Sequence, residues 1–379
     1  MTEIRITRID SADEDGLLAW NELMRVAYTS DRTAAWWRSP ETTLSQFATP
    51  RTDKEDFALI AHLGDEAVGG AEINVTADSP AEVELGVLPT CRRRGCGTAL
   101  AEAVEQILAD RDRPSVIVQT ETYCPEGVAF AESRDMRIGN EEHRLLLDLP
   151  AYLQADADRY KDSGAATTVP VIKEDPDFSV TSWIGGCPEE VLASWTRLRE
   201  QMDEDVPVGD LTRTVSHAST AAIRSHEERM EEQGWTLVGS MAHVGDLAVG
   251  YTEIMVSAHD PQIVIQEDTL VDRAYRNRGI GRALKIANLR QLPAVEATAS
   301  ARWVQTYTAT NNDPMLALNR DLGFTVADTM TALEGRVDRN RAWPVPVSRP
   351  AVRRVRRRGR RRCRAPNRGR GVRGRRCRG

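Results

Sequence analysis

The chain contains one sequence pattern twice, and such an internal duplication limits the fold to two copies of one domain. Residues 61–75 read AHLGDEAVGGAEINV and residues 242–256 read AHVGDLAVGYTEIMV, so ten of the fifteen positions are identical. A second match follows in the same order, between residues 87–100 (VLPTCRRRGCGTAL) and 271–284 (VDRAYRNRGIGRAL). The offset between the copies grows by three residues from the first match to the second, which indicates a slightly longer loop in the second copy.

Each copy has the same order of periodic segments. A short strand (4–9; 178–184) leads into a helix with apolar residues at helical spacing, and a second helical segment follows. A hairpin with a Gly-Asp turn, a third strand, a glycine-opened helix, a strand, a short helix and a last strand complete the copy. The order β-α-α-β-β-β-α-β-α-β predicts an α/β fold with a mixed sheet and helices on both faces.

Composition changes along the chain suggest the domain boundaries. We place the first copy at 1–150, a polar linker at 151–176, the second copy at 177–335 and an arginine-rich tail at 336–379. From residue 349 to the end there are 16 arginines and no acidic residue, a composition that cannot bury a core and predicts disorder. The tail is either an anion-binding arm for nucleic acid or an extension without function, such as an out-of-frame end; its abrupt onset favours the second.

The charge of the body limits the partners. Without the 16 arginines, the chain carries 34 basic and 57 acidic residues, a net charge of −23. Such a body repels nucleic acid and anionic membranes and attracts cationic solutes. No apolar run approaches the ~20 residues that span a bilayer, and the N-terminus lacks the apolar core of a signal peptide. We expect a cytoplasmic monomer or homodimer without membrane partners, which binds nucleic acid only if the tail is functional.

A glycine-rich turn follows a strand and opens a helix in both copies. Successive backbone N–H groups at such a turn, together with the helix dipole, form a cradle for an anion, and glycine leaves room for a phosphate. Arginines flank both turns and suit a pyrophosphate. The turn is neither a dinucleotide fingerprint nor a P-loop, because the required spacing is absent. No metal is expected, because none of the six cysteines forms a C-x-x-C pair.

The second copy resembles the GNAT superfamily of acyl-CoA N-acyltransferases in residues 270–284 and in the segment 312–324, which contains Asn312, Asn319 and a closing Leu-Gly-Phe. The resemblance implies two tandem GNAT-like domains that use acetyl-CoA as co-substrate. In the family, the glycine loop binds the CoA pyrophosphate, the strand before it pairs with pantetheine, and the second motif lies near the cofactor arm. The cofactor-binding residues implied are Leu270, Val271, Arg276, Asn277, Arg278, Gly279, Ile280, Gly281, Arg282 and Asn312, with Val87, Arg92, Gly95 and Gly97 in the first copy.

The two copies are not equivalent. Where the second copy has Leu-Gly-Phe at 322–324, the first has Arg-Asp-Met at 134–136, and no asparagine stands at the expected place before it. Both loops could bind CoA, but the second copy is predicted to be the catalytic one. The first is then a degenerate domain that packs against it.

An ammonium acceptor must lose a proton before it attacks a thioester, and a carboxylate is the usual base. Glu267 and Asp268 lie on the strand that approaches the thioester, and only one of them faces the cleft unless a bulge intervenes. The family commonly places a tyrosine acid where this chain has Asn319. Tyr307 on the preceding strand is a substitute candidate, although the thiolate could also take its proton from water.

An acidic cluster between the first two helices of the second copy favours a cationic acceptor: Glu200, Asp203, Glu204, Asp205 and Asp210. The leading prediction is transfer of acetyl to a primary amine of an amino sugar or an aminocyclitol antibiotic such as an aminoglycoside, which would imply antibiotic resistance. The paired layout also resembles mycothiol synthases, so a cysteinyl amino sugar remains an alternative acceptor. A non-catalytic acyl-CoA-binding regulator is the alternative from another class.

Overall fold

The computed structural model describes residues 3–48, 54–77, 79–110, 115–161, 177–205, 209–213 and 218–338. In the first copy the elements are β1 (Ile4–Arg8), α1 (Glu14–Thr29), α2 (Pro40–Ala48), β2 (Lys54–Leu63), β3 (Glu66–Thr76), β4 (Ala81–Val87), α3 (Cys96–Ala109), β5 (Ser115–Thr122), α4 (Pro125–Glu132) and β6 (Arg137–Asp148). The 3₁₀ turn η1 (Pro89–Cys91) precedes α3.

The second copy repeats this order after helix α5 (Leu149–Lys161). Its elements are β7 (Ser179–Ile184), α6 (Glu189–Asp205), α7 (Thr220–Glu232), β8 (Trp235–Val244), β9 (Leu247–Ser257), β10 (Ile263–Val271), η2 (Arg273–Tyr275), α8 (Ile280–Gln291), η3 (Leu292–Ala294), η4 (Glu296–Ser300), β11 (Trp303–Ala309), α9 (Asp313–Leu322) and β12 (Thr325–Asp338). The predicted order and the mixed α/β sheet are confirmed.

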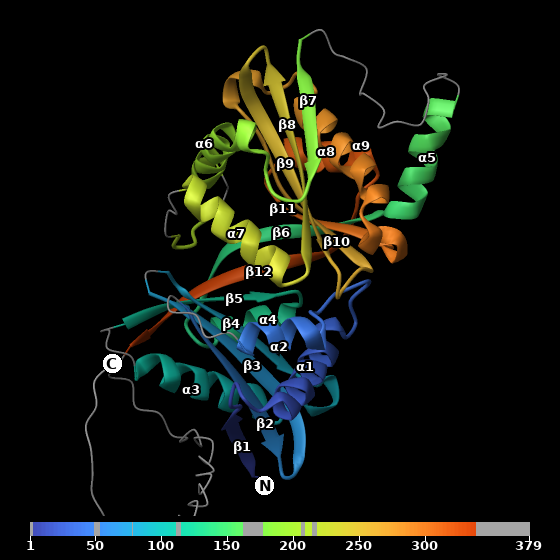
Figure 1. The fold of residues 1–379 in the computed structure, drawn as a ribbon. Helices are drawn as coiled ribbons and strands as arrows, with labels where there is room; N and C mark the ends of the chain where they lie inside the picture. Colours follow the sequence, from blue (N-terminus) through green and yellow to red (C-terminus); the bar gives the residue numbers. More distant parts are fainter. Residues whose placement is uncertain are drawn as a thin grey trace, which may run out of the picture.

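All the strands form one sheet of 12, in the order β1-β2-β3-β4-β5-β12-β6-β11-β10-β9-β8-β7. The last strand of each copy is exchanged: β12 pairs with β5 of the first copy, and β6 pairs with β11 of the second. β6 and β12 also pair with each other and cross the middle of the molecule (Figure 1). The predicted boundaries at 1–150 and 177–335 therefore separate the two sequence repeats, but the sheet is shared by both. That each range is an independent domain stays a prediction.

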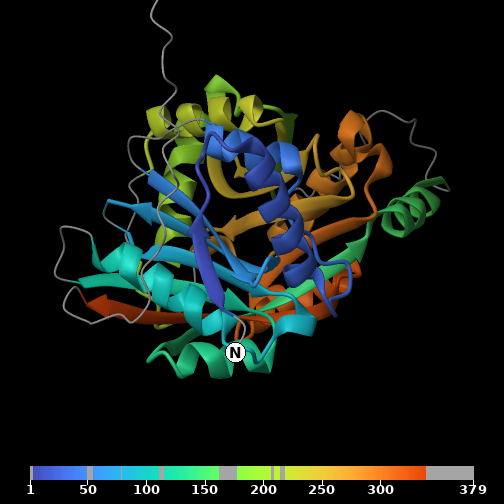
Figure 2. The ribbon, with the colours of Figure 1, turned by 90° about the horizontal axis from the view of Figure 1, so that it is seen from below.

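Helices cover both faces of the sheet because alternate strand residues face opposite sides. On β2, Leu59 and Ala61 belong to the core beneath α3, whereas Ala58 and Ile60 pack against residues of α1 and α2. A view turned by 90° shows helices on both sides of the strands (Figure 2).

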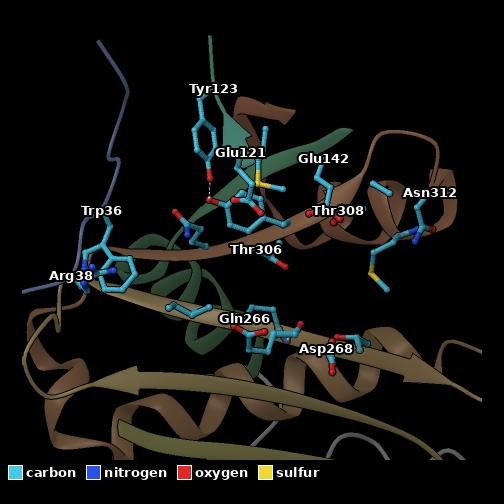
Figure 3. A pocket seen from close by; sticks show the side chains of 18 of the residues that line it. Trp36, Arg38, Glu121, Tyr123, Glu142, Gln266, Asp268, Thr306, Thr308 and Asn312 are labelled. Carbon is cyan, nitrogen blue, oxygen red and sulfur yellow. Dashed lines mark hydrogen bonds between the residues drawn. The ribbon is translucent and has the colours of Figure 1, made fainter. Parts of the chain in front are cut away.

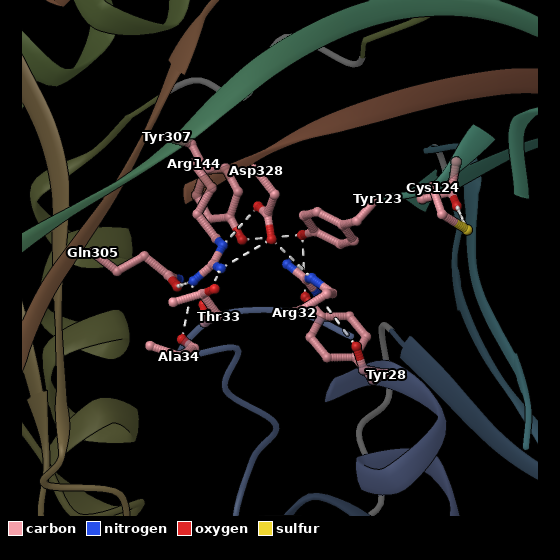
Figure 4. Close-up of polar contacts among 11 residues, drawn as sticks. Tyr28, Arg32, Thr33, Ala34, Tyr123, Cys124, Arg144, Gln305, Tyr307 and Asp328 are labelled. Carbon is pink, nitrogen blue, oxygen red and sulfur yellow. Dashed lines mark hydrogen bonds and ion pairs between the residues drawn. The ribbon is translucent and has the colours of Figure 1, made fainter. Parts of the chain in front are cut away.

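A buried ion cluster joins the exchanged strands to the loop after α1 (Figure 4). The Arg144 guanidinium on β6 donates to Asp328 on β12 at 2.8 and 2.9 Å, and to the Gln305 side chain at 3.0 Å. It also donates to the carbonyls of Thr33 and Ala34 at 2.6 and 3.0 Å. These five bonds use every N–H of the guanidinium and hold the loop in place.

Two predicted boundaries differ from the structure. Residues 149–161 form α5, so the first part of the predicted linker is helical; Arg290 of α8 binds Asp156 at 2.7 and 3.0 Å and anchors this helix to the second copy. The first three residues of the predicted tail belong to β12, where Val337 packs in the core of the first copy. The rest of the tail lies outside the described residues. No helix of the described chain is long and apolar enough to cross a membrane.

Candidate active site

The two glycine loops have the same backbone. In the second copy Asn277 and Gly279 have φ of 64° and 77°, and in the first Arg93 and Gly95 have 60° and 89°. Gly279 and Gly95 are the N-caps of α8 and α3 in the left-handed region, which favours glycine. The first turn of α8 leaves the N–H groups of residues 280–282 without helical partners, so they are available to an anion.

The second copy fits an acyl-CoA arm. β10 and β11 pair only over Ile263–Ile265 and Trp303–Gln305, and beyond these residues the two strands separate. A Cβ built at Gly281 would lie 3.6 Å from Val271 and 3.7 Å from Leu318, which are ordinary contacts. The protein's own packing therefore does not require glycine at this position, whereas a phosphate lying against the backbone would. Leu270 and Val271, the predicted pantetheine contacts, lie on β10 beyond its last pair with β11; Leu270 is buried, and Val271 pairs with Gly250 of β9.

The arginines of the loop are held by neighbours. Arg276 donates from Nε to the Val271 carbonyl at 3.0 Å and pairs with Asp205 at 2.6 Å. The Arg278 guanidinium lies 5.1 Å from the ring of Tyr275. Arg282 follows Gly281 in the first turn of α8, next to the free N–H groups. The corresponding Arg92 of the first copy donates to the Val87 carbonyl at 3.2 Å.

A cavity of about 580 Å³ lies between the two copies at the end of this opening, and residues of both copies line it (Figure 3). The second copy contributes β10, β11 and the start of α9; the first contributes the loop after α1 and strands β4, β5 and β6. Five carboxylates line the cavity: Glu84, Glu121, Glu142, Glu267 and Asp268. Of the implied cofactor residues, only Asn312 lines it, and it also caps α9 by accepting from the Met315 N–H at 3.3 Å.

A β-bulge brings both predicted base candidates to the cavity. Gln266 pairs with Ile254 and Thr269 with Thr252, so β10 has one more residue than β9 between these pairs. The extra residue breaks the alternation of the strand, and Glu267 and Asp268 both line the cavity. The corresponding strand of the first copy, β4, has no bulge. There a single carboxylate, that of Glu84 three residues before Val87, stands where the second copy has Glu267 and Asp268.

The two carboxylates differ in their surroundings. Asp268 accepts from the Tyr251 hydroxyl at 3.1 Å and lies 4.0 Å from Arg199. Glu267 keeps surface open to the cavity, and its carboxylate has no hydrogen bond or ion pair within the described part of the chain. Glu267 is exposed to the cavity, but desolvation by the protein around it, with the charges of Asp268 and Glu253, raises its pKa to about 7. A carboxylate with this pKa can accept a proton near neutral pH.

Each copy also has a buried glutamate on the strand that pairs with the one carrying these carboxylates. The sequence analysis missed both glutamates. Glu253 on β9 binds Arg199 of α6 at 2.8 Å, and Glu72 on β3 binds Arg38. Glu72 and Glu253 occupy the same position of the first repeated segment. A glutamate kept in both copies was therefore visible in the sequence and could have indicated this position. Each pair neutralises an arginine next to the cavity, and the cavity keeps an excess of negative charge.

Tyr307 also lies in the cavity wall. Its hydroxyl is 3.0 Å from that of Tyr123, which is 3.1 Å from that of Tyr28 (Figure 4). Burial raises the pKa of Tyr307 and of Tyr123, so both phenols keep their protons at neutral pH. Asn319 is buried and donates to the Thr308 hydroxyl at 3.1 Å; Thr308 lines the cavity, but Asn319 does not.

The acidic cluster predicted to border the acceptor lies elsewhere. None of its five residues lines the cavity. Asp205 pairs with Arg273 and Arg276, and Asp203 pairs with Arg213 at 2.6 Å. These carboxylates neutralise nearby arginines, which the linear sequence did not reveal. The cluster therefore does not contribute to the cavity, whose carboxylates come from other strands.

The first copy keeps the backbone of the motif that its sequence lacks. Asp135 has φ of 62° where the second copy has Gly323 at 99°, so the end of α4 resembles the end of α9. Cys124 is the N-cap of α4 without a side-chain hydrogen bond, in the place of Asn312. The described residues contain no group of His, Cys, Asp and Glu side chains arranged to hold a metal ion.

Comparisons with known proteins agree with this architecture. Residues 18–131 match the model of the acetyltransferase (GNAT) family. A tandem GNAT protein from the clavulanic acid biosynthesis pathway, solved without AcCoA, is 22% identical and superposes with a TM-score of 0.68 over 88% of this chain and 99% of its own. A GCN5-related N-acetyltransferase from Sphaerobacter thermophilus is 16% identical, with a TM-score of 0.60 over 88% and 96%. Residues 18–131 are thus matched to a GNAT-family domain, and the chain has the fold of tandem GNAT proteins.

Among curated proteins, a mycothiol acetyltransferase of Corynebacterium glutamicum (strain R) is 26% identical over 281 residues, which is 73% of this chain and 81% of that protein. GNAT enzymes use acetyl-CoA, and the splayed strands, the free N–H groups and the open space at Gly281 fit it.

The glycine loop of the second copy allows a direct test of the predicted CoA site. Gly281→Asp places a carboxylate against the predicted pyrophosphate, and loss of one charge-assisted hydrogen bond weakens CoA binding roughly 10- to 100-fold. Calorimetry with CoA measures the change. The matched Gly97→Asp variant of the first copy should have a smaller effect; an equal or larger one would reverse the assignment of the catalytic copy.

Proposed function

We propose that the protein transfers an acetyl group from acetyl-CoA to a primary amine of a small cationic molecule held in the cavity between the copies. The observation that carries the proposal is the meeting of a free carboxylate, Glu267, with four further carboxylates at the end of the second copy's acyl-CoA opening. Such a cavity attracts ammonium groups and excludes anions. Amino sugars and aminocyclitols, including aminoglycoside antibiotics, belong to this class of acceptor.

Glu267 is the proposed base. Bound acetyl-CoA would supply the acetyl thioester. Glu267 would take a proton from the ammonium group, the amine nitrogen would form a bond to the acetyl carbonyl carbon, and the carbon–sulfur bond would break. Asp268, held by Tyr251 and near Arg199, would fix the orientation of the acceptor rather than accept the proton.

The departing thiolate needs one proton, and the attacking nitrogen has a second proton to lose, which would restore the proton of the donor. Tyr307 is the proposed donor, because its protonated hydroxyl lies in the cavity wall and is connected to Tyr123 and Tyr28. Tyr123 and Tyr28 belong to the first copy, so the chain of hydroxyls would tie the chemistry of the second copy to the first. Water in the open cavity is the alternative proton source.

A cysteinyl amino sugar of the mycothiol type is the second candidate acceptor. The similarity to a mycothiol acetyltransferase supports it. Trp36 and Trp37 also line the cavity, and each has a buried Nε1 without a hydrogen-bond partner in the described chain, which suits a sugar hydroxyl.

Thiol release from acetyl-CoA tests the proposal. The full chain would be assayed with an aminoglycoside, an amino sugar, a cysteinyl amino sugar and a polyol without an amino group. We expect acceptor-dependent release with amines only, with kcat/KM falling as salt screens the cavity charge. CoA binding without turnover of any amine would instead support the non-catalytic alternative.

A further inference from the structure

A row of carboxylates from the first copy faces the proposed base across the cavity. Glu84 lies on β4, Glu121 on β5 and Glu142 on β6, and all three line the cavity. Figure 3 shows Glu121 and Glu142 on one side and Gln266 and Asp268 on the other. The carboxylates therefore form two groups, one on each copy.

The strand register fixes the spacing of this row. Glu121 pairs with Ala332 and Glu142 with Met330, two β12 residues that share a face. β12 lies between β5 and β6, and the two partner residues are two positions apart along it, so the backbones of the two glutamates are roughly 12 Å apart. Glu84 is on the strand next to β5, just beyond the pair of Val83 with Thr120. The charge of Glu142 raises the pKa of Glu121, and that of Glu121 raises the pKa of Glu84, so these carboxylates disfavour one another's ionisation unless a cation lies between them.

Buried polar atoms without partners mark the same cavity as a ligand site. Oε2 of Glu84 is buried and has no hydrogen-bond partner in the described chain. The same holds for Nε1 of Trp37, a residue only 7% exposed, and for Oε1 of Gln266, only 3% exposed. Unpaired buried groups of this kind cost stability, and a ligand with donors and acceptors would satisfy them.

The basic residues near the row do not neutralise it. The cavity lining has five carboxylates but only two basic side chains, Arg38 and Lys285. Arg38 is already bound to Glu72. Burial lowers the pKa of Lys285 to about 7, and its ammonium lies 5.6 Å from the ring of Phe324.

We propose that Glu84, Glu121 and Glu142 form a second ammonium subsite, and that the acceptor carries at least two amino groups. The inference rests on the proposed acetyl transfer and extends it: one amino group meets Glu267 and loses its proton, while the other stays charged against the first copy. The first copy is then the part of the enzyme that selects the acceptor, and not only a packing partner.

Proton release gives a test that needs no turnover. Burial and the charge of Glu72 raise the pKa of Glu84, which also faces Glu121, Glu82 and Arg38. Glu121 is exposed to the cavity, but desolvation by the protein around it, with the charges of Glu142 and Glu82, raises its pKa to about 7. Burial also raises the pKa of Glu142, and this effect outweighs the hydrogen bond from Asn140, which lowers the pKa. A raised pKa means that these groups hold protons near neutral pH, and a bound dication should displace them.

The experiment compares linear diamines with amino alcohols of the same length on the full chain. Calorimetry at neutral pH in two buffers of different ionisation enthalpy should give tighter binding of the diamine, by about tenfold or more, with more protons released. Glu121→Gln and Glu142→Gln should reduce this advantage and the proton release. Glu200→Gln, an exposed α6 carboxylate outside the cavity, is the matched control and should leave both unchanged.

The outcomes separate the two proposals. Equal binding of diamine and amino alcohol by the wild-type protein, or an advantage that survives both variants, would overturn the subsite. Selective diamine binding without acetylation would uphold the subsite and count against the proposed transfer. With turnover, the variants should raise KM for the diamine more than for the amino alcohol, whereas a loss that is equal for both acceptors would also overturn the subsite.

Discussion

Glu267→Gln should lower kcat/KM for an ammonium acceptor by roughly 10²–10⁴-fold, the usual contribution of a general base. The amide cannot take the proton but has nearly the same shape, so CoA affinity should be unchanged. In the wild-type enzyme kcat/KM should fall as pH drops through about 7, because protonation removes the base form of Glu267. The variant should lose this inflection and recover rate as rising pH deprotonates the acceptor itself.

Asp268→Asn separates the two carboxylates of the bulge. Asp268 is bound by Tyr251, so its amide variant should change KM more than the pH profile. Steady-state rates over a pH range, with thermal melting to check folding, measure both variants. If Glu267→Gln kept full turnover and the wild-type pH dependence, the base would be another residue, and Glu84 at the matching place of the first copy would be the next to test.

The repeat made most of the fold predictable. Ten identities between residues 61–75 and 242–256 establish two copies, and apolar periodicity gives each copy its strands and helices. Gly279 and Gly95 also allowed the anion cradle to be located, because a strand, a left-handed glycine and a helix follow one another locally. These features depend on neighbours in the sequence.

The exchange of the last strands could not be predicted in this way. β6 and β12 have the same local pattern whichever copy they join, and the partner is chosen by tertiary contacts such as that of Arg144 with Asp328. The cavity between the copies depends on this exchange, since Glu142 and Tyr307 reach it from paired strands of different copies. Glu84 could have been found, because it stands three residues before Val87, as Asp268 does before Val271.

The bulge in β10 was also beyond the sequence. An extra residue in one strand leaves no mark in composition, and its consequence, two adjacent carboxylates on one cavity, needs the register against β9. The acidic cluster around Asp205 shows the opposite error: it is conspicuous in the sequence, yet it lies outside the cavity, and Asp205 itself binds arginines of η2 and the glycine loop.

The ion cluster at the exchanged strands should be the most sensitive point for stability. Asp328→Ala removes the carboxylate that binds the buried Arg144 guanidinium, and an uncompensated buried charge costs roughly 3–5 kcal/mol. Burial opposes the ionisation of Asp328, but hydrogen bonds from Arg144 and Arg32 outweigh it and hold its pKa below the ordinary value. Stability from this pair is therefore present above about pH 4 and is lost as pH falls further.

Chemical denaturation would measure the effect, with Glu22→Ala as the control. Glu22 pairs with Arg25 on the exposed face of α1, where such a pair contributes about 0.3–0.5 kcal/mol. The loss in Asp328→Ala should extend to the acceptor cavity, because Arg144 also holds the carbonyls of Thr33 and Ala34 at the base of the loop that carries Trp36. A variant as stable as the control would mean that the exchanged strands are held by their pairing alone. One that is destabilised but keeps its acceptor KM would show that the loop does not depend on Arg144.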